Sequence, residues 1–148
     1  MRIVENKTFD EERALYGSQG LLVRNCRFEG EADGESALKE SRNITVDGCY
    51  WNLRYPFWHV KGLNINNTEL TPNCRAALWY TDSLVIKSSR LHGIKALREC
   101  SDIVIRDCDI CSAEFGWKNR SVSMTNSSVS GEYFMLLSSS LRFDNVKL

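Results

Sequence analysis

The chain has 148 residues and a mass of 16.9 kDa, the size of one domain with a sizeable core. Nineteen Lys and Arg balance nineteen Asp and Glu, and a net charge of zero argues against charge-driven binding to nucleic acid or an anionic membrane. Hydrophobic residues make up 43% and charged residues 26% of the chain, which argues against wholesale disorder.

The first thirteen residues contain no apolar run of the kind that a signal peptide needs. No later stretch approaches the ~20 apolar residues of a membrane span. We therefore expect a cytoplasmic protein with neither a membrane nor a nucleic acid as partner.

A pattern of alternating apolar residues recurs along the chain, as in the segments LLVRNCRF and IVIRDCDI. A degenerate copy begins at Arg2, and 19 residues later the clear copies start. Their starts are separated by 23, 19, 21, 19, 19 and 19 residues. A fixed period of this kind indicates a solenoid. The seven starts are Leu21, Ile44, Leu63, Leu84, Ile103, Val122 and Leu141.

Each repeat predicts two or three short strands and leaves no room for a helix. Apolar positions alternate at period two, are often β-branched, and precede a corner. A leucine-rich repeat, the other architecture near this period, has a stricter Leu and Asn consensus. We therefore predict an all-β, single-stranded parallel β-helix of about seven coils of 19–23 residues, with one domain over residues 1–148. Residues 1–20 are expected to form an N-terminal cap and a first partial coil, and the extra residues at 29–35 and 71–73 to form loops.

Two columns of equivalent residues follow each predicted strand. The first is rich in Asn, Asp and Gly, which tolerate the left-handed backbone of a corner: Asn25, Gly48, Asn67, Ser88, Asp107, Asn126 and Asn145. The second is small and is expected to face inward: Cys26, Cys49, Thr68, Ser89, Cys108, Ser127 and Val146. We expect the cysteines to be reduced core residues, and we expect no metal and no cofactor.

Four segments resemble a bacterial β-helix family of unknown function in the pectin-lyase-like group. They are ENKTFDEERALYGS, SALKESRNI, RYPFWHV and ALWYTDSLVI. The resemblance covers essentially the whole chain and implies that the β-helix is right-handed. It supplies no catalytic residues, because the family carries no established activity.

A column of aromatic and basic residues is the candidate ligand site. Alternation around the inward Leu97 column predicts that its members face outward, with Arg98 between Trp79 and Trp117 at cation–π spacing. Such a face suits sugar rings and uronate carboxylates, so our first hypothesis is a noncatalytic carbohydrate-binding module. Its predicted binding residues are Trp58, Trp79, Tyr80, Arg98 and Trp117.

Two other functions stay open. A polysaccharide lyase or glycoside hydrolase would use Glu99 and Arg98, but no second acid lies in the Glu99 column on an adjacent coil. The sequence therefore favours a protein without catalytic activity. The third hypothesis is a structural scaffold that acts through the end of the rod.

The last coil keeps full core character, with Leu141, Phe143, Val146 and Leu148 in the apolar positions. A terminal coil without a cap leaves apolar side chains and strand edges exposed. We predict that this uncapped coil packs against a second copy as a two-fold homodimer. The alternative is that further coils of a longer chain cover it.

Overall fold

The computed structural model describes residues 2–148, and every regular element within them is a β-strand. Each full coil begins with a long strand, and these strands stack in parallel as one column. Their bounds are β1 Arg2–Glu5, β3 Gln19–Arg24, β5 Arg42–Asp47, β7 Lys61–Asn66, β10 Asp82–Lys87, β13 Ser101–Arg106, β16 Arg120–Ser130 and β18 Ser139–Lys147.

Shorter strands form the other sides of the coil. The strands after the first corner are β2 Thr8–Phe9, β4 Arg27–Phe28, β6 Tyr50–Trp51, β8 Glu69–Leu70, β11 Arg90–Leu91 and β14 Asp109–Cys111. The third side carries β9 Leu78–Trp79, β12 Leu97–Arg98, β15 Glu114–Trp117 and β17 Tyr133–Leu136, which form a separate sheet in the C-terminal half.

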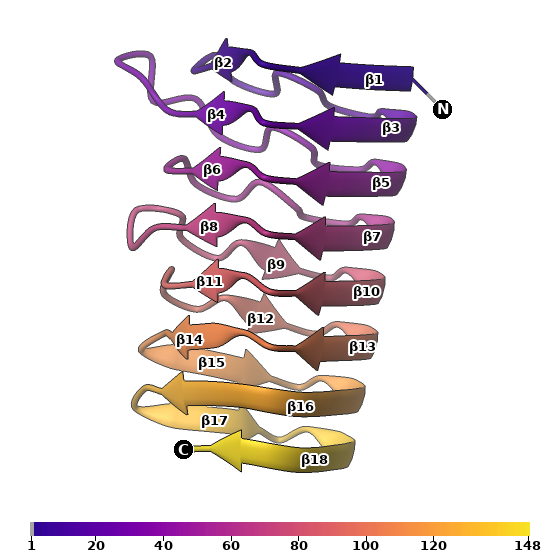
Figure 1. Ribbon diagram of the computed structural model, residues 1–148, viewed down its shortest axis with the longest axis vertical. Coiled ribbons are helices and arrows are strands. Elements are labelled where there is room, and N and C mark those ends of the chain that lie inside the picture. The colour runs from indigo at the N-terminus through magenta and orange to yellow at the C-terminus, as the bar shows by residue number, and fades with distance from the viewer. Residues whose placement is uncertain (1) are drawn as a thin grey trace.

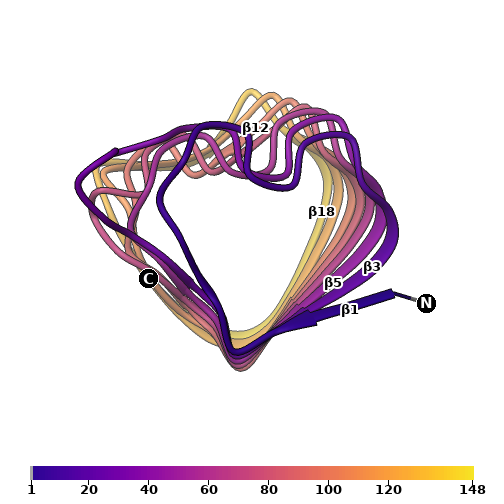
Figure 2. The same ribbon diagram turned by 90° about the horizontal axis from the view of Figure 1, so that it is seen from above.

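The coils form a right-handed parallel β-helix, which confirms the predicted fold class. In Figure 1 the long strands run leftward in front and β9 and β12 run rightward behind while the chain descends. Figure 2 shows the coils superimposed around a three-sided outline. Residues 2–148 contain eight long strands, because the degenerate first copy forms β1 in register with β3 in addition to the seven clear copies. The insertions at 29–35 and 71–73 lie in loops after β4 and β8, as predicted.

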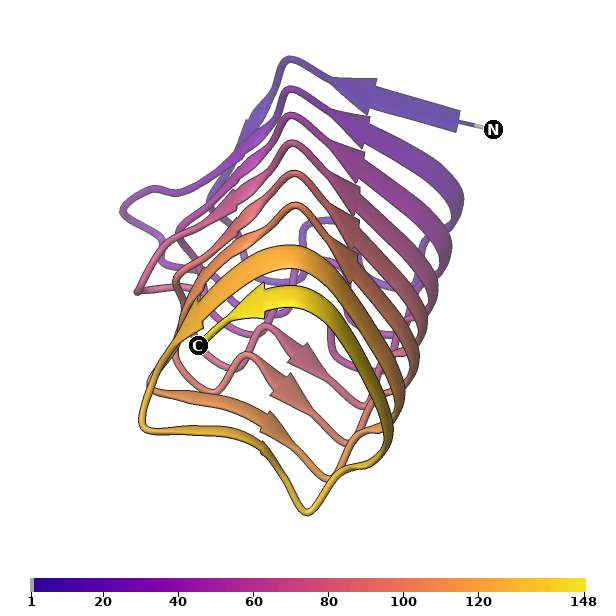
Figure 3. The ribbon, with the colours of Figure 1, turned by 60° about the horizontal axis from the view of Figure 1, so that its bottom comes forward.

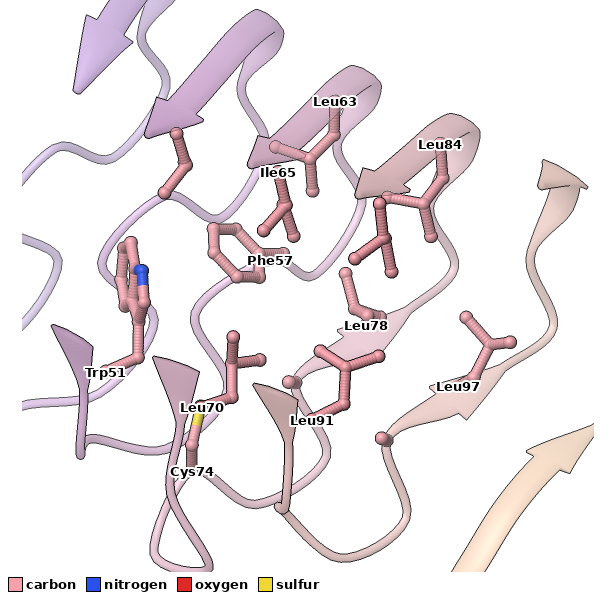
Figure 4. Packing of buried hydrophobic residues seen from close by; sticks show 14 of the residues in the cluster. Trp51, Phe57, Leu63, Ile65, Leu70, Cys74, Leu78, Leu84, Leu91 and Leu97 are labelled. Atoms are coloured by element: carbon pink, nitrogen blue, oxygen red, sulfur yellow. The ribbon is translucent and has the colours of Figure 1, made fainter. Parts of the chain in front are cut away.

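The core is one continuous cluster along the axis of the rod. Leu63 and Ile65 of β7 are fully buried, and so are their register partners Leu84 and Ile86 of β10. Figure 4 shows Leu63, Ile65 and Leu84 pointing into the interior, with Ile65 beside Phe57. Each coil therefore buries its apolar residues against the coils before and after it, as the common period predicts.

The Asn-rich column forms the first corner, as the sequence predicts. All eight of its members, with Asn6 of the first coil included, have positive φ. Three further columns also adopt the left-handed conformation, and none of them was predicted. The first is Gly20, Asn43, Gly62, Ser83, Asp102, Ser121 and Ser140, and the second is Gly17, Glu40, His59, Tyr80, Glu99, Lys118 and Leu137. The third, present in five coils, is Arg13, Ser36, Tyr55, Ala76 and Lys95.

Small polar side chains complete the backbone hydrogen bonding after two of the corners. The Cys49 N–H donates to Thr68 Oγ1 at 3.3 Å, and the Thr68 N–H donates to Ser89 Oγ at 3.2 Å. The same kind of bond follows the corner before the long strand, where the Cys100 N–H donates to Asn119 Oδ1 at 2.9 Å. A buried N–H needs a partner, so this geometry explains why the small inward column stays polar through several coils.

The C-terminal coil is less covered than the coils above it. Figure 3 shows this end of the rod coming forward, with β18 as its last strand. Leu141 and Phe143 are each 39% exposed, whereas Val122 and Met124 in the same columns of β16 are buried. At the other end Arg2 is exposed and Val4, Phe9 and Leu15 pack partly buried against the core.

No helix among the described residues is long and apolar enough to span a lipid bilayer.

Candidate functional site

The outward aromatic column forms a stack that runs along the rod. The rings of Trp58 and Trp79 lie parallel, with centroids 5.0 Å apart and planes 5° apart. The Arg98 guanidinium follows, with its Cζ 4.7 Å from the centre of Trp79 and 4.0 Å from that of Trp117. β9, β12 and β15 set this order, because Trp79, Arg98 and Trp117 are register partners. The spacing of 19 residues predicted this arrangement.

Two indoles are also fixed by hydrogen bonds to the neighbouring coil. Trp58 Nε1–H donates to the Ala76 carbonyl at 2.6 Å, and Trp79 Nε1–H donates to the Lys95 carbonyl at 2.7 Å. Stacking covers both faces of Trp79, which has Trp58 on one side and Arg98 on the other. A ligand of this column would therefore meet the edge of the Trp79 ring.

A pocket of about 170 Å³ opens beside the stack. It is lined by Trp79, Lys95, Leu97, Arg98, Glu114, Trp117 and Tyr133. Three of the five predicted binding residues are therefore in this lining. Trp58 is not, and Tyr80 instead stacks on His59 with ring centroids 4.8 Å apart.

Three pocket residues were missed by the sequence analysis. Lys95, Glu114 and Tyr133 are spaced by 19 residues and form one further column, although their residue types differ. Lys95 Nζ lies 3.6 Å from Glu114 Oε2, and Glu114 pairs in register with Tyr133 of β17. Burial, followed by the negative charge of Glu114, raises the pKa of the Tyr133 hydroxyl, which therefore stays a neutral hydrogen-bonding group around pH 7.

The Arg98 guanidinium has an unmet hydrogen-bonding donor. Its Nε is buried and finds no hydrogen-bond partner within residues 2–148. The Glu99 carboxylate forms an ion pair with it at 3.5 Å but without hydrogen-bond geometry. Because this Nε is buried, the missing hydrogen bond is a cost that the fold carries and not an open contact for a ligand.

The acids near the pocket are already engaged with cations. Glu99 is paired with Arg98 and Glu114 with Lys95. Glu99 is exposed, occupies a left-handed corner at φ 48° and is not in the pocket lining. Of the two carboxylates, only Glu114 therefore lines the pocket.

The cysteines and histidines do not form a second site with these residues. All six cysteines are free thiols; five are buried and Cys111 is exposed. His92 contacts Asp109 at 3.1 Å on another face of the rod. Between residues 2 and 148, no three His, Cys, Asp or Glu side chains are grouped so as to hold a metal ion.

Fold and site together define a right-handed parallel β-solenoid with a cation-lined pocket on its outer aromatic stack. The chain belongs to DUF3737, a family of proteins of unknown function, whose model matches residues 2–148. No curated protein matches it.

Two solved structures share a distant likeness with the chain. One is QnrB1, a plasmid-mediated fluoroquinolone resistance protein, at 13% identity over 99% of this chain and 89% of that chain, with a TM-score of 0.35. The other is a proposed glycosyl hydrolase from Parabacteroides merdae, at 10% identity over 97% of this chain and 77% of that chain, with a TM-score of 0.30. Likeness at this level carries no argument about function.

Proposed function

We propose that this β-solenoid is a noncatalytic carbohydrate-binding module whose ligand occupies the pocket beside the stack of Trp79, Arg98 and Trp117. One observation carries the proposal: the Arg98 guanidinium is held between two indoles beside a pocket that aromatic, cationic and hydrogen-bonding side chains line together. The pocket, at about 170 Å³, is smaller than the ~300–1,000 Å³ of sites for drug-sized ligands. A single sugar unit is therefore the expected occupant.

The lining supports a sugar because it combines apolar and polar groups. Trp117 and Leu97 offer apolar contact, while the Tyr133 hydroxyl and the Lys95–Glu114 pair offer hydrogen bonds to ligand hydroxyls. Contact with the indoles would come from ring edges, since stacking occupies the faces of Trp79. The pectin-lyase-like grouping indicated by the sequence is part of the same proposal and adds an analogy of fold only.

The test is a glycan array followed by calorimetric titration of the best ligand. Trp79→Ala and Arg98→Ala are each expected to weaken binding roughly 5- to 30-fold, equivalent to about 1–2 kcal/mol. Arg27→Ala is the matched control, because Arg27 makes the same kind of contact over Tyr50 at 4.2 Å away from the pocket lining. Unchanged affinity in both pocket variants would contradict the site, and cleavage of the array ligand would favour the lyase or hydrolase alternative.

We also propose that the C-terminal coil is a dimer interface. Leu141, Phe143 and Val146 occupy core columns, yet all three are partly or largely exposed. When two β18 strands pair antiparallel about a two-fold axis at Phe143, Arg142 of each copy lies opposite Asp144 of the other. This charge complementarity supports a second copy of the chain as the occupant.

A further inference from the structure

Two cysteines of the small inward column are stacked in adjacent coils. Cys26 and Cys49 are register neighbours, because β3 pairs with β5 just before them and β4 pairs with β6 just after them. Neighbouring strands lie about 4.8 Å apart, and the two Cα atoms of a disulfide usually lie ~4.4–6.8 Å apart. The backbone of this pair is therefore already spaced for a disulfide bond.

The Cys49 side chain points at the coil that carries Cys26. Its Sγ accepts a hydrogen bond from the Cys26 N–H at 3.5 Å and donates to the Val23 carbonyl of the same coil at 3.4 Å. The Cys26 thiol turns instead to the first coil, where it donates to the Val4 carbonyl at 3.6 Å. One rotamer change of Cys26 about χ1 would therefore bring the two sulfur atoms together.

The other four cysteines have no cysteine at the equivalent position of an adjacent coil. Cys108 has a serine on either side of it in the column, and Cys100 lies between Thr81 and Asn119. Cys111 is exposed, whereas Cys108 is buried. A disulfide within the chain therefore has one pair that the fold holds in place for it.

The pair lies near the N-terminal end of the rod, where the first coil is only partly packed against the core. Cys26 and Cys49 line one open groove of about 600 Å³, but their exposed fractions are only 1% and 4%. Burial also raises the pKa of Cys49 to about 11, so little thiolate forms while the coils are closed. An end coil has a neighbour on one side only and opens most readily, which admits a small thiol-reactive molecule.

We infer that Cys26 and Cys49 are a redox modification site, at which a low-molecular-weight disulfide such as oxidised glutathione joins them and staples the second coil to the third. One cysteine thiolate attacks the glutathione disulfide and releases one glutathione thiolate. The other cysteine thiolate attacks the mixed disulfide and releases the second. The two protons lost by the cysteines pass to the two glutathione thiolates, so two electrons reduce glutathione and one S–S bond replaces another.

The experiment incubates the full chain carrying Cys111→Ser with oxidised glutathione, blocks the remaining thiols, and digests the unfolded product with trypsin without reduction. Cys111→Ser removes the exposed thiol, which would otherwise form mixed disulfides. We expect mass spectrometry to find peptides 25–27 and 43–54 joined, and to find them separate after reduction. We expect the melting temperature to rise on oxidation and to return on reduction, because a disulfide restricts the unfolded chain.

Serine variants in the same background identify the pair. Cys26→Ser and Cys49→Ser are each expected to abolish both the joined peptides and the rise in melting temperature. Cys108→Ser is the matched control, because it removes a thiol of the same column that has no stacked cysteine, and it is expected to keep both effects. Glutathione adducts without joined peptides, a link between other cysteines, or a link that forms only in the unfolded chain would each overturn the inference.

Discussion

Many non-glycine residues of this protein adopt the left-handed backbone conformation that usually favours glycine. Tyr80, Glu99 and Lys118 share a corner column with φ between 48° and 58°. A left-handed conformation costs an ordinary residue roughly 1–2 kcal/mol. Hydrogen bonds between coils hold it in place, as when the Tyr80 N–H donates to the Arg98 carbonyl at 2.9 Å. Stacking between coils, rather than local propensity, therefore fixes these corners.

The energetic cost of the left-handed corner before each long strand can be tested with two serines of β16. Ser121 of β16 is exposed at φ 57°, whereas Ser123 lies two residues along in paired strand. Ser121→Gly is expected to stabilise the protein by up to about 1 kcal/mol, because glycine adopts positive φ freely. Ser123→Gly is expected to destabilise it by roughly 0.5–1 kcal/mol. Thermal unfolding measures both, and equal changes of the same sign would show that the corner carries no strain.

Because the thiols of Cys49 and Cys100 are buried, we expect the protein to become less stable in alkaline solution. Burial raises the pKa of Cys49 from 9.0 to about 11 and that of Cys100 to about 12. Between pH 9 and these values the unfolded chain loses protons that the folded chain keeps, so the free energy of unfolding falls as the pH rises. Below pH 9 both states keep the protons and this contribution is constant.

A variant with serine at both positions separates the contribution of these two thiols from that of other groups that titrate in the same pH range. The double variant Cys49→Ser and Cys100→Ser is expected to lose less of its melting temperature between pH 8 and pH 10.5 than the parent chain. Serine fits the first site because Ser89 and Ser127 occupy the same column. Cys111→Ser is the control, because it makes the same substitution at a thiol that is exposed. A double variant that follows the parent curve would contradict the assignment.

At the scale of single elements, β18 carries the prediction about assembly. Phe143→Glu is expected to dissociate the proposed dimer, because a buried unpaired carboxylate at the two-fold axis is strongly unfavourable. Light scattering at micromolar concentration measures the mass. Arg142→Glu is expected to weaken the dimer by placing like charges opposite one another, and the charge swap Arg142→Glu with Asp144→Arg is expected to restore it. A parent chain that is monomeric at this concentration would refute the interface.

The strands were predictable because the apolar residues of the interior recur at a nearly constant period. Leu63, Leu84 and Ile103 lie in one register, and the structure places all three in the core. The first corner was predictable because Asn, Asp and Gly signal it. The other left-handed columns carry residues such as Tyr80 and Glu99, whose conformation is imposed by hydrogen bonds to the next coil. Their residue types therefore do not indicate a corner.

The candidate site was only partly predictable for a related reason. A spacing of 19 residues places Arg98 between Trp79 and Trp117, and the structure has them there. Which ring faces stay open depends on side-chain orientation, which spacing does not determine. Lys95, Glu114 and Tyr133 form a column too, but their residue types share no feature that would mark them as partners.

At the scale of the whole molecule, the constant register predicts that an entire coil can be removed. Deleting residues 44–62 joins Asn43 to Leu63 and leaves every remaining residue in its column. We expect this variant to fold and to keep the pocket, because a coil contacts only its neighbours. Deleting residues 44–61 removes one residue fewer and would turn the inward side chains at the junction outward. Circular dichroism and ligand titration compare the two, and equal folding would contradict a strict register.

The ladder of hydrogen bonds between coils also determines how the rod responds to force. These bonds lie along its length, so tension applied along the axis loads the coils in series. An end coil has a neighbour on one side only and yields first. The rod will therefore unravel in steps, and each released coil of 19 residues adds roughly 60 Å of extended chain.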